Sequence, residues 1–210
     1  MNPYKLADKA ILQLNEAALR RKQKAKSKLL IDGFDELNVI KQIDALYKDL
    51  DKNNRKKFKE LWLARFQEVY RGVKGKDADD IEDLLEMHLS GLLEDPNDTT
   101  HYTYSAEVTR KRDRAKEAIL SVPTRAQKQL MMDKHVTYFQ QQTAWYADFT
   151  SQDAEITAYK EAGVKKVVRH EMDDDKVCSV CKAADGEVYD IDKIPPLPHL
   201  RCRRWFTPLN

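Results

Sequence analysis

The sequence predicts a mainly α-helical protein in which an N-terminal helical region and further helices precede a small C-terminal α+β domain. Proline is absent from Tyr4 to Asp95 and only four glycines interrupt that stretch, so little there would break a helix. Apolar residues before Gly163 recur at spacings of three and four, which is the period of a helix face. After Gly163 the pattern changes to short valine-rich segments, which favour β structure.

Composition and charge exclude several classes of protein. The chain has 210 residues with 37 basic and 35 acidic side chains, a net charge of +2, and suits one large or two small domains. Its 41% hydrophobic content can build a core, while 34% charged residues predict long helices exposed to solvent. The longest apolar run, 61–64, is far shorter than the roughly 20 residues that span a bilayer. We therefore expect no membrane segment, no secretory signal and synthesis in a cytoplasm.

The first half of the chain is predicted to hold four helices. Their apolar faces are Ala7, Ile11, Leu14 and Ala18; then Leu37, Ile40, Leu46 or Tyr47, and Leu50; then Phe58, Leu61, Trp62, Phe66, Val69 and Tyr70; and finally Ile81, Leu84, Leu85, His88 and Leu92. The pair Asn53-Asn54 predicts a break between the second and third helices. The glycines at 72 and 75 predict a left-handed turn after the third. His88 is interpreted as a histidine at the edge of the core.

The second half begins after a turn-rich stretch at 94–100, and we divide the chain into 1–95, 96–150 and 151–210. A helix with a basic exposed side is predicted to end at 121–123. From Thr124 a further helix carries an aromatic stripe, which is more typical of a core than of a cofactor site. Thr150 or Ser151 is predicted to cap the next helix, and Gly163 to end it.

Two basic stretches are candidate contacts for phosphates or for acidic protein surfaces. The first comprises Arg20, Arg21, Lys22, Lys24, Lys26 and Lys28, with no acidic residue between them. The second comprises Arg110, Lys111, Arg112, Arg114 and Lys116 around the single acidic residue Asp113. The alternative interpretation is a solvated helix face, which we favour for the first stretch because lysine runs are common on exposed helices.

Four candidate metal ligands lie near the C-terminus, Cys178, Cys181, His199 and Cys202, in the pattern C-x2-C-x17-H-x2-C. Two close pairs separated by a predicted hairpin can bring three thiolates and one imidazole into tetrahedral contact with Zn²⁺. Such a closed set leaves no position for water, so the pattern predicts one structural zinc ion and no metal-dependent hydrolysis. Residues 171–210 are about as few as a core alone can stabilise, and zinc would supply the difference.

Other interpretations of these residues stay open. The two cysteines of the C-x2-C pair can form a redox centre, although no βαβ pattern precedes them and the second pair would be unexplained. The cysteines can also be buried as small apolar residues. His170 is a substitute candidate ligand.

Residues from about Thr150 to the C-terminus resemble the C-terminal domain of phage Mu F-like minor head proteins, also called phage head morphogenesis proteins. The matching segments are the helix-ending Ala162-Gly163, a short strand at 166–170, acidic residues at 173–175, the C-x2-C pair, Asp185-Gly186, and a proline-rich run into His199 and Cys202 at 195–203. Their order and spacing agree over about 60 of the 210 residues. Family members often continue Cys-Arg-Cys, whereas Arg204 follows Arg203 here, and the first hundred residues match no family motif.

The resemblance implies a virion protein of a tailed bacteriophage. It implies a minor capsid protein in head morphogenesis near the portal, made in the host cytoplasm and placed in the capsid interior or at the portal vertex. The implied partners are the portal protein or the major capsid protein, with a role in DNA packaging or ejection and no membrane partner. Arg201, Arg203 and Arg204 would contact packaged double-stranded DNA or acidic capsid surfaces, while Trp205 and Phe206 close the small core.

An assembly role agrees with the residues, because the sequence offers neither a catalytic cluster nor a glycine-rich phosphate loop. We therefore expect no enzymatic activity. One alternative is a non-specific DNA-binding zinc protein that uses the basic stretches. A weaker alternative is an HNH-like nuclease, since similar zinc pairs frame some of these enzymes. That reaction needs a histidine base and further ligands, yet His199 is already assigned to zinc and only Asn210 lies nearby.

Overall fold

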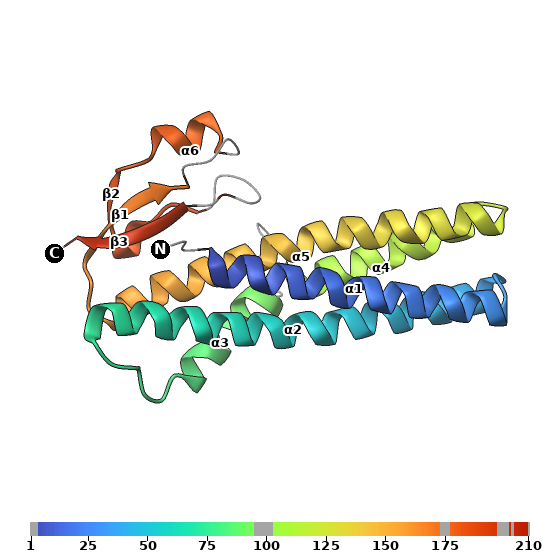
Figure 1. Cartoon of the computed structure of the whole chain (residues 1–210), viewed down its shortest axis with the longest axis horizontal. Helices are drawn as coiled ribbons and strands as arrows, with labels where there is room; N and C mark the ends of the chain where they lie inside the picture. The colour runs from blue at the N-terminus through green and yellow to red at the C-terminus, as the bar shows by residue number, and fades with distance from the viewer. Residues whose placement is uncertain (1–3, 95–102, 173–176, 197–201, 203, 210) are drawn as a thin grey trace. The chain divides into compact units, whose positions relative to one another are not determined.

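The computed structural model describes residues 4–94, 103–172, 177–196, 202 and 204–209 (Figure 1). Five helices come first: α1 (Lys5–Asp32), α2 (Glu36–Lys74), α3 (Glu82–Glu94), α4 (Tyr104–Leu120) and α5 (Arg125–Glu161). The C-terminal part follows with β1 (Lys166–Glu171), α6 (Ser179–Ala183), β2 (Val188–Asp190), a 3₁₀ turn (Ile191–Lys193) and β3 (Arg204–Leu209). The predicted fold class, mainly helical with a small α+β region at the C-terminus, is confirmed. Most of the predicted boundary at 94–100 lies outside the described residues.

Helix α2 runs without interruption through Asn53-Asn54, so the predicted break there is wrong. Asn54 is 2% exposed, and its amide donates hydrogen bonds to the Tyr104 hydroxyl at 2.8 Å and to the Thr143 hydroxyl at 3.2 Å. Asparagine disfavours a helix when its side chain bonds to the nearby backbone, and these tertiary partners remove that competition. The turn after α2 is confirmed, because Gly75 has a φ of 73°.

Helix α5 continues through Thr150 and Ser151, so the prediction that one of them caps a new helix is also wrong. The Thr150 hydroxyl donates to the Tyr146 carbonyl one turn earlier, at 2.6 Å, which satisfies it within the helix. None of the residues from 145 to 159 is exposed, and only one stripe of this stretch of α5, at Trp145, Phe149, Asp153 and Ile156, is partly accessible. The predicted end at Gly163 is confirmed by its φ of 79° directly after the helix.

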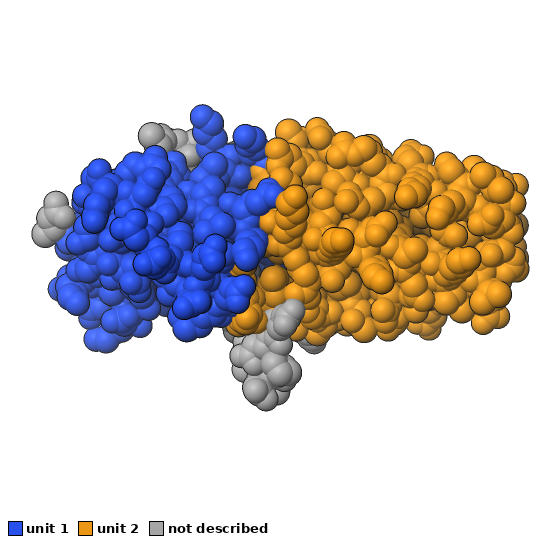
Figure 2. Space-filling view, turned by 90° about the horizontal axis from the view of Figure 1, so that it is seen from below, with its two compact units in different colours: residues 1–9, 59–88, 145–210 blue, residues 10–58, 89–144 orange. Residues whose placement is uncertain are grey.

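The chain forms two compact units, coloured separately in Figure 2. One unit comprises residues 10–58 and 89–144 and is helical. Its core contains the ring pairs Tyr47–Phe139 and Phe58–Tyr104, each with centroids 5.2 Å apart. The other unit comprises residues 1–9, 59–88 and 145–210 and contains the sheet. The predicted domains 1–95, 96–150 and 151–210 stay a prediction.

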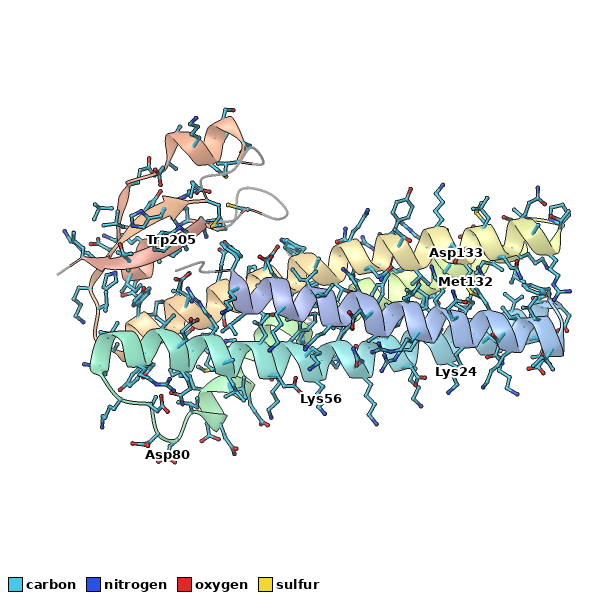
Figure 3. All side chains as sticks on the ribbon, viewed as in Figure 1. Lys24, Lys56, Asp80, Met132, Asp133 and Trp205 are labelled. Atoms are coloured by element: carbon cyan, nitrogen blue, oxygen red, sulfur yellow. The ribbon has the colours of Figure 1, made fainter. Side chains whose placement is uncertain are left out.

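The sheet has three antiparallel strands in the order β2-β1-β3. Side chains alternate along the strands, so that Val167 and Arg169 of β1 are buried together with Arg204 and Phe206 of β3. Outward-facing side chains include Trp205, labelled on β3 in Figure 3, whose ring stacks on His170 with centroids 4.4 Å apart.

Helix side chains occupy the backbone groups of strand β3 that β1 leaves free. The Tyr159 hydroxyl donates to the Phe206 carbonyl at 2.9 Å, and the Phe206 N–H donates to Glu155 at 3.5 Å. The Tyr4 hydroxyl donates to the carbonyl of Arg204. An edge strand otherwise offers unpaired backbone groups, so these bonds fix β3 against α5 and against Tyr4, the residue before α1.

None of the described helices is both long enough and apolar enough to cross a bilayer.

Candidate metal centre

Three potential metal ligands meet at one end of the sheet. Glu171 is the last residue of β1, Cys181 lies in α6, and Cys202 precedes β3. One donor atom from each lies within 4.8 Å of the other two. The sulfurs of Cys181 and Cys202 are 3.5 Å apart, and both residues are 1% exposed. The fold therefore places a buried group of sulfur and oxygen donors where three elements converge.

Local structure holds the turn that carries the first cysteine pair. Cys178 is the N-cap of α6, and its sulfur accepts a hydrogen bond from the Cys181 N–H at 3.4 Å. After α6, Gly186 takes a φ of 84° and donates its N–H to the Arg169 carbonyl at 2.8 Å. The Asp185 carboxylate accepts the Glu171 N–H at 2.9 Å. These bonds fix α6 and its following loop against the central strand.

The spacing of the sulfurs fits a single zinc ion. Two Zn–S bonds of about 2.3 Å at a tetrahedral angle place the sulfurs about 3.8 Å apart. The observed separation of Cys181 and Cys202 is 3.5 Å. Cysteine and glutamate both ligate zinc. Residues Glu171, Cys181 and Cys202 are thus close enough together to hold a metal ion.

Burial sets the protonation of this group. It raises the pKa of the Cys181 thiol to about 12, with the neighbouring Cys202 adding to the effect. Burial also raises the pKa of Cys202 and that of Glu171, the latter opposed by Arg169. Burial therefore disfavours the charged forms of all three groups. A bound divalent cation reverses this preference, because it stabilises thiolate and carboxylate directly.

Of the four ligands predicted from the sequence, the structure brings Cys181 and Cys202 together. Cys178 lies beside Cys181 at the start of α6 but is not one of the three residues whose donor atoms lie mutually within 4.8 Å. His199 lies outside the described residues. The substitute candidate His170 instead places its Nε2 2.8 Å from the Thr207 hydroxyl.

Sequence reasoning missed Glu171 as a potential ligand. The available signal was strand alternation, since Val167, Arg169 and Glu171 occupy every second position of β1 and share one face. A charged pair on the inner face of a strand needs a polar partner there.

Half of the residues of the first basic stretch use their charges inside their own unit. Lys22 and Lys26 both pair with Asp133, at 3.1 and 2.9 Å. Arg21 donates to the Asn53 side chain at 3.2 Å. Arg20, Lys24 and Lys28 are exposed, and Arg20 lies 3.9 Å from Glu16 one turn earlier.

The second basic stretch is paired in the same way. Arg112 and Lys116 lie 3.5 and 2.9 Å from Asp44. Arg110 pairs with the buried Glu107, which Lys111 also approaches to 3.4 Å. Arg114 is exposed.

Of the three arginines near the C-terminus, Arg201 and Arg203 lie outside the described residues. Arg204 is 3% exposed and donates to the carbonyls of Pro195 and Pro196 at 2.7 and 3.3 Å. Its Nε also lies 3.3 Å from Gln152. Contact with DNA or a capsid surface needs an exposed guanidinium, whereas this one ties together the segment before β3 and α5.

Comparison of the chain with protein-family models, curated proteins and solved structures gave no match.

Proposed function

We propose that this chain is a minor head protein of a tailed bacteriophage, acting in head morphogenesis near the portal through a zinc-stapled C-terminal module. The order and spacing of the C-terminal motifs support the family, as argued from the sequence. The structural observation that supports it best is the pairing of Cys181 with Cys202. These residues are 21 positions apart in the chain, and their buried sulfurs lie 3.5 Å apart.

Zinc would act as a structural cross-link in this module. Cys181 and Cys202 would hold it, with Cys178 and His199 as the further ligands that the motif predicts. The ion would join the start of α6 to the segment before β3, two parts of the chain that little secondary structure connects. Structural zinc contributes an apparent ~10–16 kcal/mol in small zinc-finger peptides near neutral pH. That is more than surface contacts of so small a module provide.

A rigid module of this kind suits assembly. The proposed partners are the portal protein or the major capsid protein, and packaged double-stranded DNA in packaging or ejection. A DNA-binding protein without a role in the head is less well supported, because Lys22, Lys26, Arg112 and Lys116 already face acidic side chains of the chain. Phosphate contacts would have to compete with these internal pairs.

The direct experiment is mass spectrometry of purified virions and of proheads from the phage that encodes the chain. We expect its peptides in both, at a constant ratio to the major capsid protein. An abundant replication protein from the same lysate is the control for contamination. Absence of the chain from both particles would contradict the proposal.

A second experiment tests the module itself. In a phage that lacks the gene, complementation with the double variant Cys181→Ser and Cys202→Ser should yield few infectious particles. The matched control is Lys182→Ala, which alters an exposed residue of the same short helix. A normal yield of infectious particles with the double variant would show that assembly does not need the metal site. DNA binding by the pure protein that weakens steeply between about 50 and 200 mM salt would favour the DNA-binding alternative.

A further inference from the structure

Glu171 carries a buried oxygen that lacks a hydrogen bond within the described part of the chain. Its side chain is 5% exposed, and its Oε2 atom has no partner there. An unsatisfied buried acceptor costs about 1–3 kcal/mol, and more when it is charged. One carboxylate oxygen of this residue lies within 4.8 Å of the sulfurs of both Cys181 and Cys202. A cation placed among these atoms would be bound by all three side chains and would give the Glu171 oxygen a partner.

The other oxygen of Glu171 is held firmly by Arg169. Both guanidinium contacts go to Oε1, from Nε at 2.7 Å and from Nη2 at 2.5 Å. The backbone N–H of Glu171 is also fixed, by Asp185 at 2.9 Å. The carboxylate therefore has a set orientation, with one oxygen occupied and the other left available.

This geometry differs from that of a simple ion pair. In an ion pair with no further ligand, arginine and a carboxylate frequently form two parallel hydrogen bonds, one to each carboxylate oxygen. Here both guanidinium contacts go to Oε1, and of the two only the one from Nε is a hydrogen bond, although the side chains of both residues are only 5% exposed. Carboxylates that bind metals are commonly oriented in this manner by a hydrogen-bonding neighbour. A metal ion bound by the carboxylate would explain why the Oε2 atom of Glu171 has no hydrogen bond.

We propose that Glu171 is a direct ligand of the metal ion, with Arg169 as its positioning residue. This inference rests on the zinc-stapled module of the proposed function and adds an oxygen donor that the C-x2-C and H-x2-C pairs do not contain. The thiolates of Cys181 and Cys202 and the carboxylate of Glu171 carry three negative charges against the two positive charges of zinc, and a third thiolate from Cys178 would make four. Arg169 and the buried Arg204, both of which act electrostatically on Glu171, supply compensating positive charge. The ion is held by sulfur together with carboxylate oxygen.

The first test measures metal affinity in the full chain. Zinc affinity is determined by competition with a chromophoric chelator for the wild type, for Glu171→Gln and for the control Glu187→Gln. Both substitutions remove one negative charge, but Glu187 is exposed. We expect at least a tenfold loss of zinc affinity in Glu171→Gln and none in the control. Substitution of residues that only orient a metal ligand already lowers metal affinity by roughly 10–100-fold, and a direct ligand should matter at least as much. Equal affinity of all three proteins would overturn the proposal.

The second test needs no variant, and so stands even where Glu171→Gln fails to fold. X-ray absorption of the zinc-loaded wild type should show an oxygen at about 2.0–2.2 Å beside sulfurs at about 2.3 Å. A first shell of sulfur and imidazole alone, or a wild type that binds no zinc, would overturn the assignment of Glu171. Neither result affects the test of the proposed function, because mass spectrometry of virions and proheads decides separately whether the chain is present in the head.

Discussion

Glu155 allows a quantitative test of how the core of the sheet-containing unit is built. This carboxylate of α5 is 2% exposed and accepts hydrogen bonds from Arg65 at 2.7 Å and from the Phe206 N–H at 3.5 Å. It therefore links α2, α5 and β3 within one unit. The perturbation is Glu155→Gln, which keeps the size and one acceptor oxygen but cannot titrate.

Burial raises the pKa of Glu155 from the ordinary 4.5 to about 7, and the nearby Arg65 opposes the shift without cancelling it. Unfolding exposes the carboxyl, which then titrates near 4.5. Between these two pH values the folded protein binds more protons than the unfolded chain, so stability falls as the pH rises through this window and is level above it. At about 1.4 kcal/mol per pKa unit, the loss attributable to this group is about 3 kcal/mol.

The assay is urea unfolding at pH values from 4.5 to 8, with the free energy of unfolding of Glu155→Gln subtracted from that of the wild type. The subtraction removes contributions of groups common to both proteins. We expect the difference to fall by about 3 kcal/mol up to pH 7 and then to level off. The control is Glu161→Gln, an exposed residue of the same helix. Free energies of unfolding of wild type and Glu155→Gln that run parallel with pH within about 0.5 kcal/mol would show that Glu155 does not titrate with a raised pKa in the folded protein.

Three further predictions concern other buried polar contacts. A hydrogen bond to Asp153 raises the pKa of the half-buried His88, so Asp153→Asn should lower that pKa in an NMR titration. In the wild type the pair stabilises the fold at low pH, and this contribution is lost as the pH rises through the raised pKa; Asp153→Asn should lack this loss. Asn54→Ala removes two buried hydrogen bonds and should cost about 2 kcal/mol in urea unfolding, at roughly 1 kcal/mol each. Tyr4→Phe removes the hydroxyl that lies 3.4 Å from the Cys202 carbonyl and should cost about 1–3 kcal/mol while speeding amide exchange in β3.

Each of these has a clear contrary outcome. An unchanged histidine titration in Asp153→Asn would show that the carboxylate does not set the pKa of His88. If Asn54→Ala lowers the free energy of unfolding by less than about 0.5 kcal/mol, the hydrogen bonds of Asn54 are not what keeps α2 continuous. If amide hydrogen exchange in β3 is the same in Tyr4→Phe as in the wild type, the Tyr4 hydroxyl does not stabilise the sheet.

The sequence predicted the helices well where one apolar face repeats, and it located the turns at Gly75 and Gly163. It failed where tertiary contacts overrule local preference. Asn54 looked like a helix breaker, yet it is buried and bonded to side chains far along the chain. Thr150 looked like a cap, yet it is buried and its hydroxyl bonds to the carbonyl one turn earlier within a continuous helix. Neither environment can be read from local spacing.

The candidate site divides in a similar way. The cysteine spacing indicated that Cys181 and Cys202 would meet, and they do. The part played by Glu171 depends on strand register and on Arg169, so it appears only once β1 and β3 are paired. The family resemblance implied a surface contact for Arg204, but the alternation of β3 turns its side chain inward.

The most direct measurement of the central claim is the metal content of the purified full chain, determined by elemental analysis with urea unfolding before and after addition of a chelator. We expect one zinc ion per chain and a marked loss of stability when the ion is removed. A natively folded protein that carries no metal, and whose unfolding curve the chelator leaves unchanged, would contradict it.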